Sequence, residues 1–356
     1  MSARIVVGMS GGVDSSVAAA LLAESGHEVI GVTMHLAGSS SRCCSLDDAD
    51  DARRVAARLG IRFYVANYKE RFREEVMLPF ADAYLAGQTP IPCIACNKRF
   101  KFDLLLARAR ALGADAVATG HYARIATGPG GAPHLLRGVD PGKDQSYFLY
   151  NLSAEQLRRI RFPIGALCKS EVRQRARALG LATAEKPESQ EICFVPQGNY
   201  AGVVEALRPE AQHGAGDIVD RAGRRLGRHR GVHRYTVGQR RGLGLQGLPG
   251  GPRYVVALDA ARRRVVVGGG DELLVSGAQI GGVSWTFEPP AGAPLRARVQ
   301  IRHRHEAVAA RIEPGPGGTA KVHFAEPVRA LSPGQAAVFY DGERLLGGGV
   351  IAGALS

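Results

Sequence analysis

The stretch Gly8–Ser15, which reads Gly-Met-Ser-Gly-Gly-Val-Asp-Ser, has the residue types and spacing of a phosphate-binding loop. It follows a short apolar run, Ile5–Val7, that predicts a buried strand. It precedes Ser16–Glu24, which predicts a helix closed by Gly26. Glycines between a strand and a helix leave backbone N–H groups open to an anion, and the helix dipole adds partial positive charge. The loop is therefore predicted to bind phosphate.

The kind of phosphate follows from the residues that the loop lacks. It has no Gly-Lys-Ser/Thr ending, which loops that hydrolyse a γ-phosphate carry, and it does not fit Gly-x-Gly-x-x-Gly. The hexapeptide Ser10–Ser15 instead resembles the pyrophosphate loop of ATP pyrophosphatases, in which a substrate oxygen is adenylated and pyrophosphate leaves. The alternative is a turn of small residues that binds no ligand. Magnesium is expected to bridge the phosphates, with Asp14 either as its ligand or as a cap of the following helix.

A Cys-x-x-Cys motif, from Cys93 to Cys96, is the second candidate for chemistry. We expect it on a loop, residues 90–98, that leads into a helix over residues 99–112. The motif could be half of a zinc site, a redox pair, or the place of a single nucleophile at Cys96. For zinc, no second cysteine or histidine pair has suitable spacing. For a nucleophile, a helix N-terminus and Lys98 would stabilise the thiolate.

The remaining cysteines are too few and too unevenly spaced for a secreted disulfide framework. Cys193 lies in the stretch Glu188–Val195, just past the last helix predicted for the first domain, and is the other candidate for thiol chemistry. The alternative for any single cysteine is a buried apolar thiol. We expect that alternative for Cys43, Cys44 and Cys168.

The length and composition indicate a globular protein without a membrane segment. A chain of 356 residues accommodates two or three domains, and 45% hydrophobic residues can form a sizeable core. The apolar runs are far shorter than the roughly 18–20 residues of a membrane helix. Glycines interrupt the N-terminus by Gly8, unlike a leader peptide. We therefore expect a soluble cytoplasmic protein with no membrane partner.

The formal net charge of +13 indicates a polyanionic partner. The alternative is the composition of an arginine-rich proteome. The distribution favours nucleic acid, because one segment concentrates arginine without any Asp or Glu, whereas a solvated face usually mixes signs. His229 and His233 lie in the same segment. Its arginines are residues 221, 224, 225, 228, 230, 234, 240 and 241.

The first 185 or so residues alternate between strand-like and helix-like segments, which predicts an α/β domain with a mostly parallel sheet and flanking helices. Further strands are predicted at Glu28–Leu36, Ile61–Ala66 and Ala114–Ala118, and helices at Asp47–Leu59, after a capping box at Ser153, and at Ser170–Leu179. Ligands of such sheets lie beyond the carboxyl ends of the strands. That rule places Ser10–Ser15, Met34 and Gly120-His121 around one crevice.

After about residue 210, Gly and Pro separate short β-like runs, and long helical periodicity disappears. We predict two small, mainly-β domains there, the last a β-barrel. The expected domains are residues 1–207, 208–274 and 275–356. The β-like runs are Tyr254–Leu258, Arg264–Val267, Leu295–Ile301, Ala320–Phe324 and Ala336–Tyr340.

Essentially end to end, the chain resembles the tRNA-specific 2-thiouridylases (the MnmA family). A single pyrophosphate loop would not separate this family from synthetases that share the loop, but many ordered motifs do. The matching segments are Gly8–Ser15, Cys43-Cys44-Ser45-Leu46, Thr89–Lys98, Lys101-Phe102, Ala118–Arg124, Lys143–Leu149, Glu191–Phe194, His233–Leu243 and Ser332–Ala336.

The resemblance implies an enzyme that uses ATP to adenylate O2 of the wobble uridine in tRNA anticodons and replaces that oxygen with sulfur from a persulfide. It implies that Cys193 carries the persulfide. It implies that Cys96 is the nucleophile that frees sulfide or forms a disulfide with Cys193. The ATP site would consist of Gly8, Met9, Ser10, Gly11, Gly12, Val13, Asp14, Ser15, Met34 and Gly120. The target base would meet Ile91, Pro92 and Cys93, and the tRNA would meet His121, Lys143, Asp144, Gln145, Arg302, His303 and Gln335.

Two departures from the family pattern leave this chemistry intact. Members commonly have Asn-Pro-Asp or Asn-Pro-Cys where this chain has Ile91-Pro92-Cys93, so contact with the base there must be backbone or apolar. Members often have an aromatic residue where His303 stands, and histidine can still stack on a base or meet a phosphate. A persulfide-carrying sulfur donor is the expected protein partner, and a monomer is expected. The alternatives are another ATP pyrophosphatase and a nonenzymatic RNA-binding redox or zinc module at Cys93 and Cys96.

Overall fold

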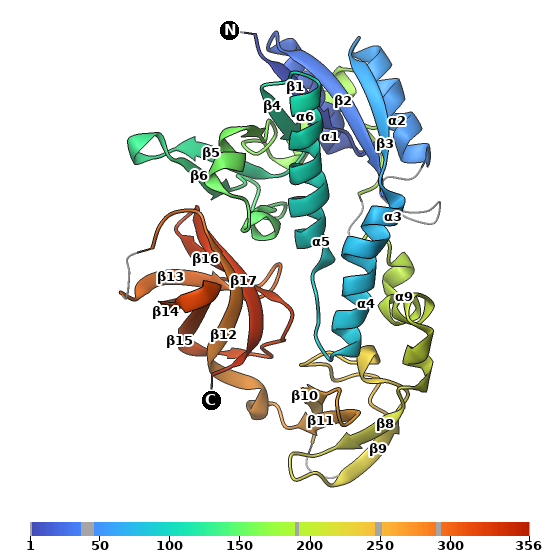
Figure 1. The fold of residues 1–356 in the computed structure, drawn as a ribbon, viewed down its shortest axis with the longest axis vertical. Helices are drawn as coiled ribbons and strands as arrows, with labels where there is room; N and C mark the ends of the chain where they lie inside the picture. Colours follow the sequence, from blue (N-terminus) through green and yellow to red (C-terminus); the bar gives the residue numbers. More distant parts are fainter. Residues whose placement is uncertain (1, 37–45, 189–191, 246–250, 290–292, 356) are drawn as a thin grey trace. The chain divides into compact units, whose positions relative to one another are not determined.

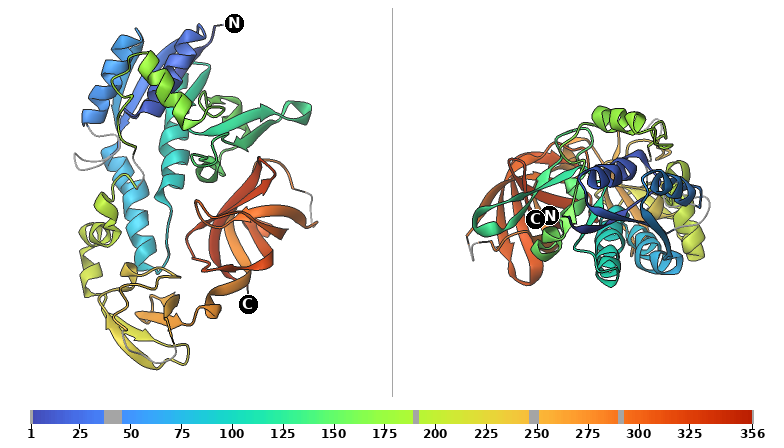
Figure 2. Two further views of the ribbon diagram at one scale, coloured as in Figure 1. Left: turned by 180° about the vertical axis from the view of Figure 1, so that it is seen from behind. Right: turned by 90° about the horizontal axis from the view of Figure 1, so that it is seen from above.

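The computed structural model describes residues 2–36, 46–188, 192–245, 251–289 and 293–355 (Figures 1 and 2). The segment Cys43-Cys44-Ser45, for which buried thiols were predicted, lies outside the described residues. The chain forms two compact units. The first contains residues 1–76, 93–198 and 343–345, and the second contains residues 77–92, 199–342 and 346–356. Among the described residues, no helix is long and apolar enough to cross a membrane.

A five-stranded parallel sheet forms the centre of the first unit, with strand order β3-β2-β1-β4-β7. Its strands are β1 (Arg4–Gly8), β2 (Glu28–His35), β3 (Arg62–Asn67), β4 (Ala116–Thr119) and β7 (Ile160–Arg161). β2 and β4 flank β1 on its two sides. The strands β2 and β3 are added on one side of β1, and the later strands β4 and β7 are added on the other. The loops after β1 and β4 therefore open beside each other at the carboxyl edge, where such sheets bind ligands. The predicted fold class is confirmed.

Helices cover this sheet because the strand residues alternate between two apolar faces. Ile5 and Val7 share one core with the helices α1 (Val13–Glu24), α2 (Leu46–Arg58) and α8 (Lys169–Ala178). Gly8 faces the same side of the sheet as Val6. A Cβ atom added at Gly8 would lie 3.3 Å from Leu105 of helix α6 (Leu105–Ala111). α6 therefore packs on the opposite face. The predicted capping box at Ser153 is present and opens helix α7 (Ala154–Arg158).

The segment with Cys93 and Cys96 is helical, so its placement on a loop was wrong. The helical run begins with α5 (Pro92–Ala95), continues as a π-helix over Cys96–Leu104 and ends with α6. Pro92 explains the early start, because proline has the backbone angle of a first helical turn and needs no hydrogen-bond partner for a backbone N–H. Cys93 consequently occupies the first turn, and Cys96 lies beyond it. The first unit also contains α3 (Lys69–Phe72) and a hairpin of β5 (Ala123–Thr127) and β6 (Pro133–Arg137).

In its described residues, the second unit combines two α-helices with two β structures, and the change in sequence texture after residue 210 predicts the β part. Its helices are α4 (Leu78–Leu85) and α9 (Tyr200–Leu207), joined by stacked Tyr84 and Tyr200 rings 4.7 Å apart. A four-stranded sheet has the order β10-β11-β8-β9, with the edge strand β9 rich in arginine. These strands are β8 (Gly216–Val219), β9 (Arg225–His229), β10 (Tyr254–Asp259) and β11 (Arg264–Gly268).

A six-stranded barrel forms the rest of the second unit, and the pairing of β12 with β17 closes it. Alternating residues such as Val299, Val322 and Phe339 fill its core. The predicted β-barrel at the C-terminal end is confirmed. The domain boundaries after residues 207 and 274 remain a prediction. The strands are β12 (Leu274–Trp285), β13 (Leu295–Gln300), β14 (Val308–Gly315), β15 (Thr319–Arg329), β16 (Ala336–Asp341) and β17 (Arg344–Ala354).

Gly11 in the loop after β1 should tolerate no side chain. It has a φ of +72°, and an added Cβ would lie 2.1 Å from the backbone oxygen of Asp48. Gly26 is a matched control, because its φ of +79° is similar and nothing lies within 4 Å of the added Cβ. We predict that Gly26→Ala costs about 1–2 kcal/mol of unfolding free energy, the cost of the backbone conformation alone, and that Gly11→Ala costs more. Urea unfolding measures both, and equal losses would contradict the close approach.

Candidate active site

The loop after β1 is held by its own serines rather than by a capping side chain. Gly12 is the N-cap of α1, and no side-chain cap hydrogen bond forms there. The Ser10 N–H donates to Oγ of Ser15 at 3.1 Å, and the Ser15 and Ser16 hydroxyls donate to the Gly12 carbonyl. The helix N-terminus therefore presents backbone donors without a carboxylate in front of them, which suits an anion.

A cavity of about 720 Å³ lies at the carboxyl edge of the parallel sheet. Its wall brings together the residues predicted from the loop and from the ends of β2 and β4, except Gly11, whose backbone faces Asp48 instead. At Gly120 the approach is so close that a Cβ would lie 2.5 Å from the backbone nitrogen of Ser15. The predicted residues in the wall are Gly8, Met9, Ser10, Gly12, Val13, Asp14, Ser15, Met34, Gly120, His121, Lys143 and Gln145.

Asp14 does not cap α1, so that alternative was wrong. It occupies the second helical position after the N-cap Gly12, and its carboxylate points toward other elements. Lys169 donates to both carboxylate oxygens at 2.7 and 2.8 Å, and the Tyr122 hydroxyl donates to Oδ1 at 2.8 Å. Burial, with the neighbouring Asp14 charge, raises the pKa of Tyr122, so the phenol remains a donor at neutral pH.

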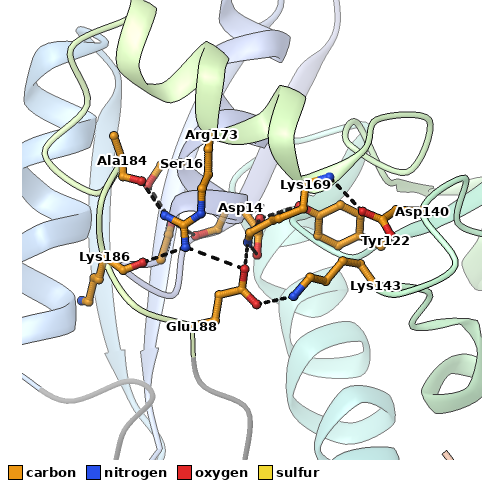
Figure 3. Close-up of polar contacts among 12 residues, drawn as sticks. Asp14, Ser16, Tyr122, Asp140, Lys143, Lys169, Arg173, Ala184, Lys186 and Glu188 are labelled. Atoms are coloured by element: carbon orange, nitrogen blue, oxygen red, sulfur yellow. Dashed lines mark hydrogen bonds and ion pairs between the residues drawn. The ribbon is translucent and has the colours of Figure 1, made fainter. Parts of the chain in front are cut away.

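Ion pairs extend from Asp14 along the wall of the cavity (Figure 3). Lys169 also contacts Glu188 at 3.0 Å, and Lys143 contacts the other Glu188 oxygen at 2.5 Å. Lys186 binds Asp48 and Asp51, each at 2.6 Å. These ion pairs place three ammonium groups of the wall against four carboxylates, and a phosphate that enters must compete with those carboxylates for the cations.

The predicted tRNA contacts in the first unit have defined local roles. His121 is buried with its Nδ1 2.7 Å from the Thr119 hydroxyl oxygen. Burial, with a smaller effect of Lys101, holds the pKa of His121 well below its usual range, so the ring is neutral. Gln145 accepts the Tyr122 N–H at 3.0 Å. Asp144 is almost fully buried and organises its own loop, because it accepts from the backbone of Gly138 and Ser146 and pairs with Arg137.

Phe72 brings the two cysteine segments of the first unit together. The centroid of its ring lies 5.3 Å from that of Phe100, which follows Cys96 on the same helical run. It lies 5.8 Å from that of Phe194, the residue after Cys193. Cys96 is buried, and Cys193 is half-buried within a turn that the Val195 N–H closes on the Ile192 carbonyl. Neither cysteine is among the described residues that line the cavity.

The other predicted contacts lie in the second unit, except Cys93. Gln335 donates to the Thr89 carbonyl at 2.8 Å and so fixes the chain that precedes Ile91 and Pro92. Arg302 donates to the Arg329 carbonyl at 3.0 Å, and His303 is exposed. The structure therefore divides the predicted tRNA contacts between both units.

The arginine-rich segment is less charged than its sequence indicates. Acidic residues from outside the segment, or at its border, neutralise three of the eight arginines: Glu272 pairs with Arg221, Asp220 with Arg224, and Glu205 with Arg234. His229 and His233 are buried and bond the Arg263 carbonyl and Glu205. Five exposed arginines remain without an acidic partner among the described residues: Arg225, Arg228, Arg230, Arg240 and Arg241.

A zinc site at the Cys-x-x-Cys motif has no support in the described part of the chain. No group of three His, Cys, Asp or Glu side chains is placed there to hold a metal ion. Magnesium has weaker demands, since one or two carboxylates and phosphate oxygens suffice. Asp14 meets that demand chemically, but the Lys169 ammonium at 2.7 Å already occupies its oxygens.

Comparisons with known proteins match this chain over nearly its whole length. A tRNA-specific 2-thiouridylase MnmA from Geobacter metallireducens is 53% identical over 99% of this chain and 98% of its own length. The protein of that name from Rhodospirillum rubrum is 52% identical over 98% and 96%. The chain belongs to the tRNA-specific 2-thiouridylase family. Among solved structures, it is similar to a 4-thiouridine synthetase–RNA complex with bound ATP, with 16% identity, a TM-score of 0.36 and coverage of 58% of this chain and 51% of that one.

Three family models match successive parts of this thiouridylase chain. The model described as tRNA methyl transferase HUP domain matches residues 3–197. The tRNA methyl transferase PRC-barrel domain matches residues 205–269, and the aminomethyltransferase beta-barrel domain matches residues 275–351. The predicted order of one α/β domain followed by two small β domains is confirmed.

Sequence reasoning did not assign a role to several charged residues of the cavity, among them Lys169, Lys186 and Glu188. Lys169 gave a usable signal, because it begins α8, where the helix dipole disfavours a positive charge. An ammonium placed there needs carboxylate partners, and it has them in Asp14 and Glu188. Nothing local in the sequence marks the partners themselves.

Lys186 should stabilise the first unit in a pH-dependent manner. Burial raises the pKa of Asp51, but hydrogen bonds from Lys186 and Arg54 outweigh burial and leave that pKa below its usual value of 3.8. We predict that Lys186→Met costs about 1–3 kcal/mol at pH 7. The stabilisation is complete above the usual pKa and is lost as the pH falls through the lowered one, so the difference from the wild type should close in acid.

Arg177→Met is the matched control for this prediction. Its partner Glu185 is 72% exposed, and such surface pairs contribute at most about 1 kcal/mol. Urea unfolding at several pH values measures both variants. A Lys186→Met loss no larger than that of Arg177→Met, or one independent of pH, would contradict the assignment.

Proposed function

We propose that this chain catalyses ATP-dependent 2-thiolation of the wobble uridine in tRNA anticodons. The observation that carries the proposal is the cavity at the carboxyl ends of β1 and β4, with the Ser10–Ser15 loop and the N-terminus of α1 in its wall. In a member of this family, that loop suits the pyrophosphate of ATP. Adenylation turns uridine O2 into the oxygen of a phosphate ester, a good leaving group.

Magnesium belongs to the proposal as a bridge between the ATP phosphates, with Asp14 as the candidate protein ligand. A bound magnesium would neutralise phosphate charge and orient the triphosphate. For Asp14 to contribute, one of its oxygens must exchange the Lys169 ammonium for the cation, since both are bonded to that lysine. The displaced ammonium remains in the wall of the cavity, where the phosphates can take it up.

Two thiols provide the sulfur chemistry. A protein persulfide at Cys193 carries a terminal sulfur atom that is not bonded to Cβ and can therefore leave. In the proposed sequence, the Cys96 thiolate attacks the inner sulfur of that persulfide, and the terminal sulfur departs as hydrosulfide toward C2 of the base. Attack at C2 expels AMP, and Cys96 and Cys193 end as a disulfide. The contacts of Phe72 with both cysteine segments support this pairing.

The tRNA is proposed to meet both units. Its target uridine would leave the stack and approach Ile91, Pro92 and Cys93. The three lie where the helical run begins, and Gln335 supports the chain before them. Outside the catalytic contacts, exposed arginines of β9 supply phosphate binding. A protein that carries a persulfide is the proposed sulfur source, and the chain is proposed to act as a monomer.

The decisive experiment is the reaction itself. The protein is incubated with ATP, tRNA and a persulfide donor, and the digested tRNA is analysed for 2-thiouridine by mass spectrometry. We predict that Cys193→Ser abolishes the product and leaves tRNA binding and adenylation intact, because only the sulfur carrier is removed. Cys168→Ser is the control and should retain activity, since serine is a favourable residue at that helix N-cap. Normal thiolation by Cys193→Ser would refute the role of Cys193.

The exposed arginines should set the salt dependence of tRNA binding. Replacement of Arg225, Arg228 and Arg230 by Ala removes three charges without acidic partners, so we predict weaker binding and a log–log salt slope flatter by about 2–3. The matched control replaces the ion-paired Arg221, Arg224 and Arg234 and should change the slope less. Binding measured over a range of salt concentrations separates the two. An unchanged slope in the first variant would show that β9 does not contact tRNA.

A further inference from the structure

Thr119, the last residue of β4, lies beside His121 at the carboxyl edge of the parallel sheet. Its hydroxyl oxygen is 2.7 Å from Nδ1 of His121, and the two residues are only 4% and 6% exposed. Among the described residues, this nitrogen is the one hydrogen-bond partner of the hydroxyl. The direction of this single hydrogen bond therefore decides which hydrogen atom the imidazole carries.

The buried surroundings favour a hydroxyl that donates. A threonine hydroxyl has one hydrogen, and a neutral imidazole has one nitrogen that donates and one that accepts. If Nδ1 were the donor, the hydroxyl hydrogen of Thr119 would be buried without an acceptor, which folded proteins avoid. If the hydroxyl donates, Nδ1 accepts, and the single ring proton must lie on Nε2.

The charge and the orientation of the His121 ring are restricted as well. Burial holds the pKa of His121 well below its usual range, and the Lys101 charge acts in the same direction, so the ring has one N–H at neutral pH. Its centroid lies 5.8 Å from that of Phe102 and 6.0 Å from that of Phe162. A half-turn of the ring would place a carbon atom, instead of Nδ1, against the Thr119 hydroxyl.

The other ring nitrogen, Nε2, is open to the cavity that His121 lines. It has no hydrogen-bond partner among the described residues, and it is not one of their fully buried polar atoms without a partner. The preceding residue, Gly120, approaches the phosphate loop so closely that an added Cβ would lie 2.5 Å from the Ser15 nitrogen. An N–H at this position suits a phosphoryl oxygen and adds no further positive charge to a wall that already contains ammonium groups.

We propose that Thr119 is a positioning residue that keeps the ring proton of His121 on Nε2, so that the ring donates a hydrogen bond to a phosphoryl oxygen in the cavity. The oxygen belongs to ATP or to the tRNA backbone, and this part rests on the proposed function, which supplies both ligands. A donor that is fixed before the ligand arrives needs no reorganisation when the oxygen enters.

Nitrogen NMR of protein with isotope-labelled histidine tests the tautomer directly, because an unprotonated ring nitrogen resonates far downfield of a protonated one. The signals that His121→Gln lacks assign the residue. We predict an unprotonated Nδ1 and a protonated Nε2 for His121 in the wild type at pH 7. A proton on Nδ1, or on both nitrogens, would overturn the proposal without any variant of Thr119.

Thr119→Val keeps the shape of the side chain and removes the hydroxyl. The Nδ1 resonance should move downfield, because that nitrogen loses its donor, and pyrophosphate affinity should fall between about threefold and tenfold, the effect of one hydrogen bond. Thr119→Ser keeps a hydroxyl and should restore both. An unchanged Nδ1 resonance in Thr119→Val would overturn the positioning role.

Thr33→Val is the matched control for loss of a buried hydroxyl. Thr33 lies on the neighbouring strand β2, is fully buried, and donates to the Met9 carbonyl at 2.7 Å. This variant loses a hydrogen bond of the same length and should leave the Nδ1 resonance of His121 unchanged. An equal shift of that resonance in Thr33→Val would show a general effect of destabilisation and would overturn the role of Thr119.

The Nε2 proton reports on the acceptor, since a stronger hydrogen bond moves an N–H proton downfield. The probes are inorganic pyrophosphate, α,β-methylene ATP, tRNA and, without any phosphate, adenosine. A downfield shift with the first two assigns the oxygen to ATP, and a shift with tRNA alone assigns it to the RNA backbone. An equal shift with adenosine, or no shift in protein shown to bind the phosphate probes, would overturn the donor role.

The inference and the proposed function fail separately. If the protein forms 2-thiouridine but His121 has its proton on Nδ1, the role of Thr119 is refuted and the function stands. If His121 has the predicted tautomer and responds to pyrophosphate but no 2-thiouridine forms with any sulfur source, the proposed function is refuted and the role of Thr119 stands.

Discussion

The ion pair between Lys169 and Asp14 joins two helix N-termini that are 155 residues apart in the chain. Both helix ends carry partial positive charge, and Lys169 adds a full one, so their approach is unfavourable without a carboxylate between them. Asp14 supplies it, and Glu188 supplies a second. This balance of charge allows α1 and α8 to open onto one cavity and leaves that cavity with cations that an entering phosphate can recruit.

Backbone proximity provides the other half of the site. Gly120 lies so close to the backbone of Ser15 that residue 120 could carry no side chain, and Gly11 makes a similar approach to Asp48. The loops after β1 and β4 can therefore meet with their N–H groups exposed to a ligand. Glycine is needed at these positions because it has no side chain to obstruct the close approach. The lysines of the cavity contribute positive charge instead.

The two cysteines proposed for sulfur transfer, Cys96 and Cys193, are not among the described residues that line the cavity. Phe72 connects the helical run of Cys96 with the turn of Cys193 through two ring contacts. Glu188, the last described residue before the gap at residues 189–191, contacts Lys143 and Lys169 in the wall of the cavity. In the proposed reaction, adenylation and sulfur transfer would therefore involve neighbouring parts of one unit.

The sequence by itself determined the features that depend on neighbouring residues: the strand–loop–helix at Gly8–Ser15, the capping box at Ser153 and the α/β order of the first domain. The early start of the helix at Pro92 was missed, although proline favours the first helical turn. Only the tertiary structure decided which charges meet. Asp14 pairs with Lys169 rather than capping its own helix, and acids outside the arginine-rich segment neutralise Arg221 and Arg234. Hydrogen bonds within a turn follow from spacing along the chain, whereas ion pairs depend on distances through space that only packing sets.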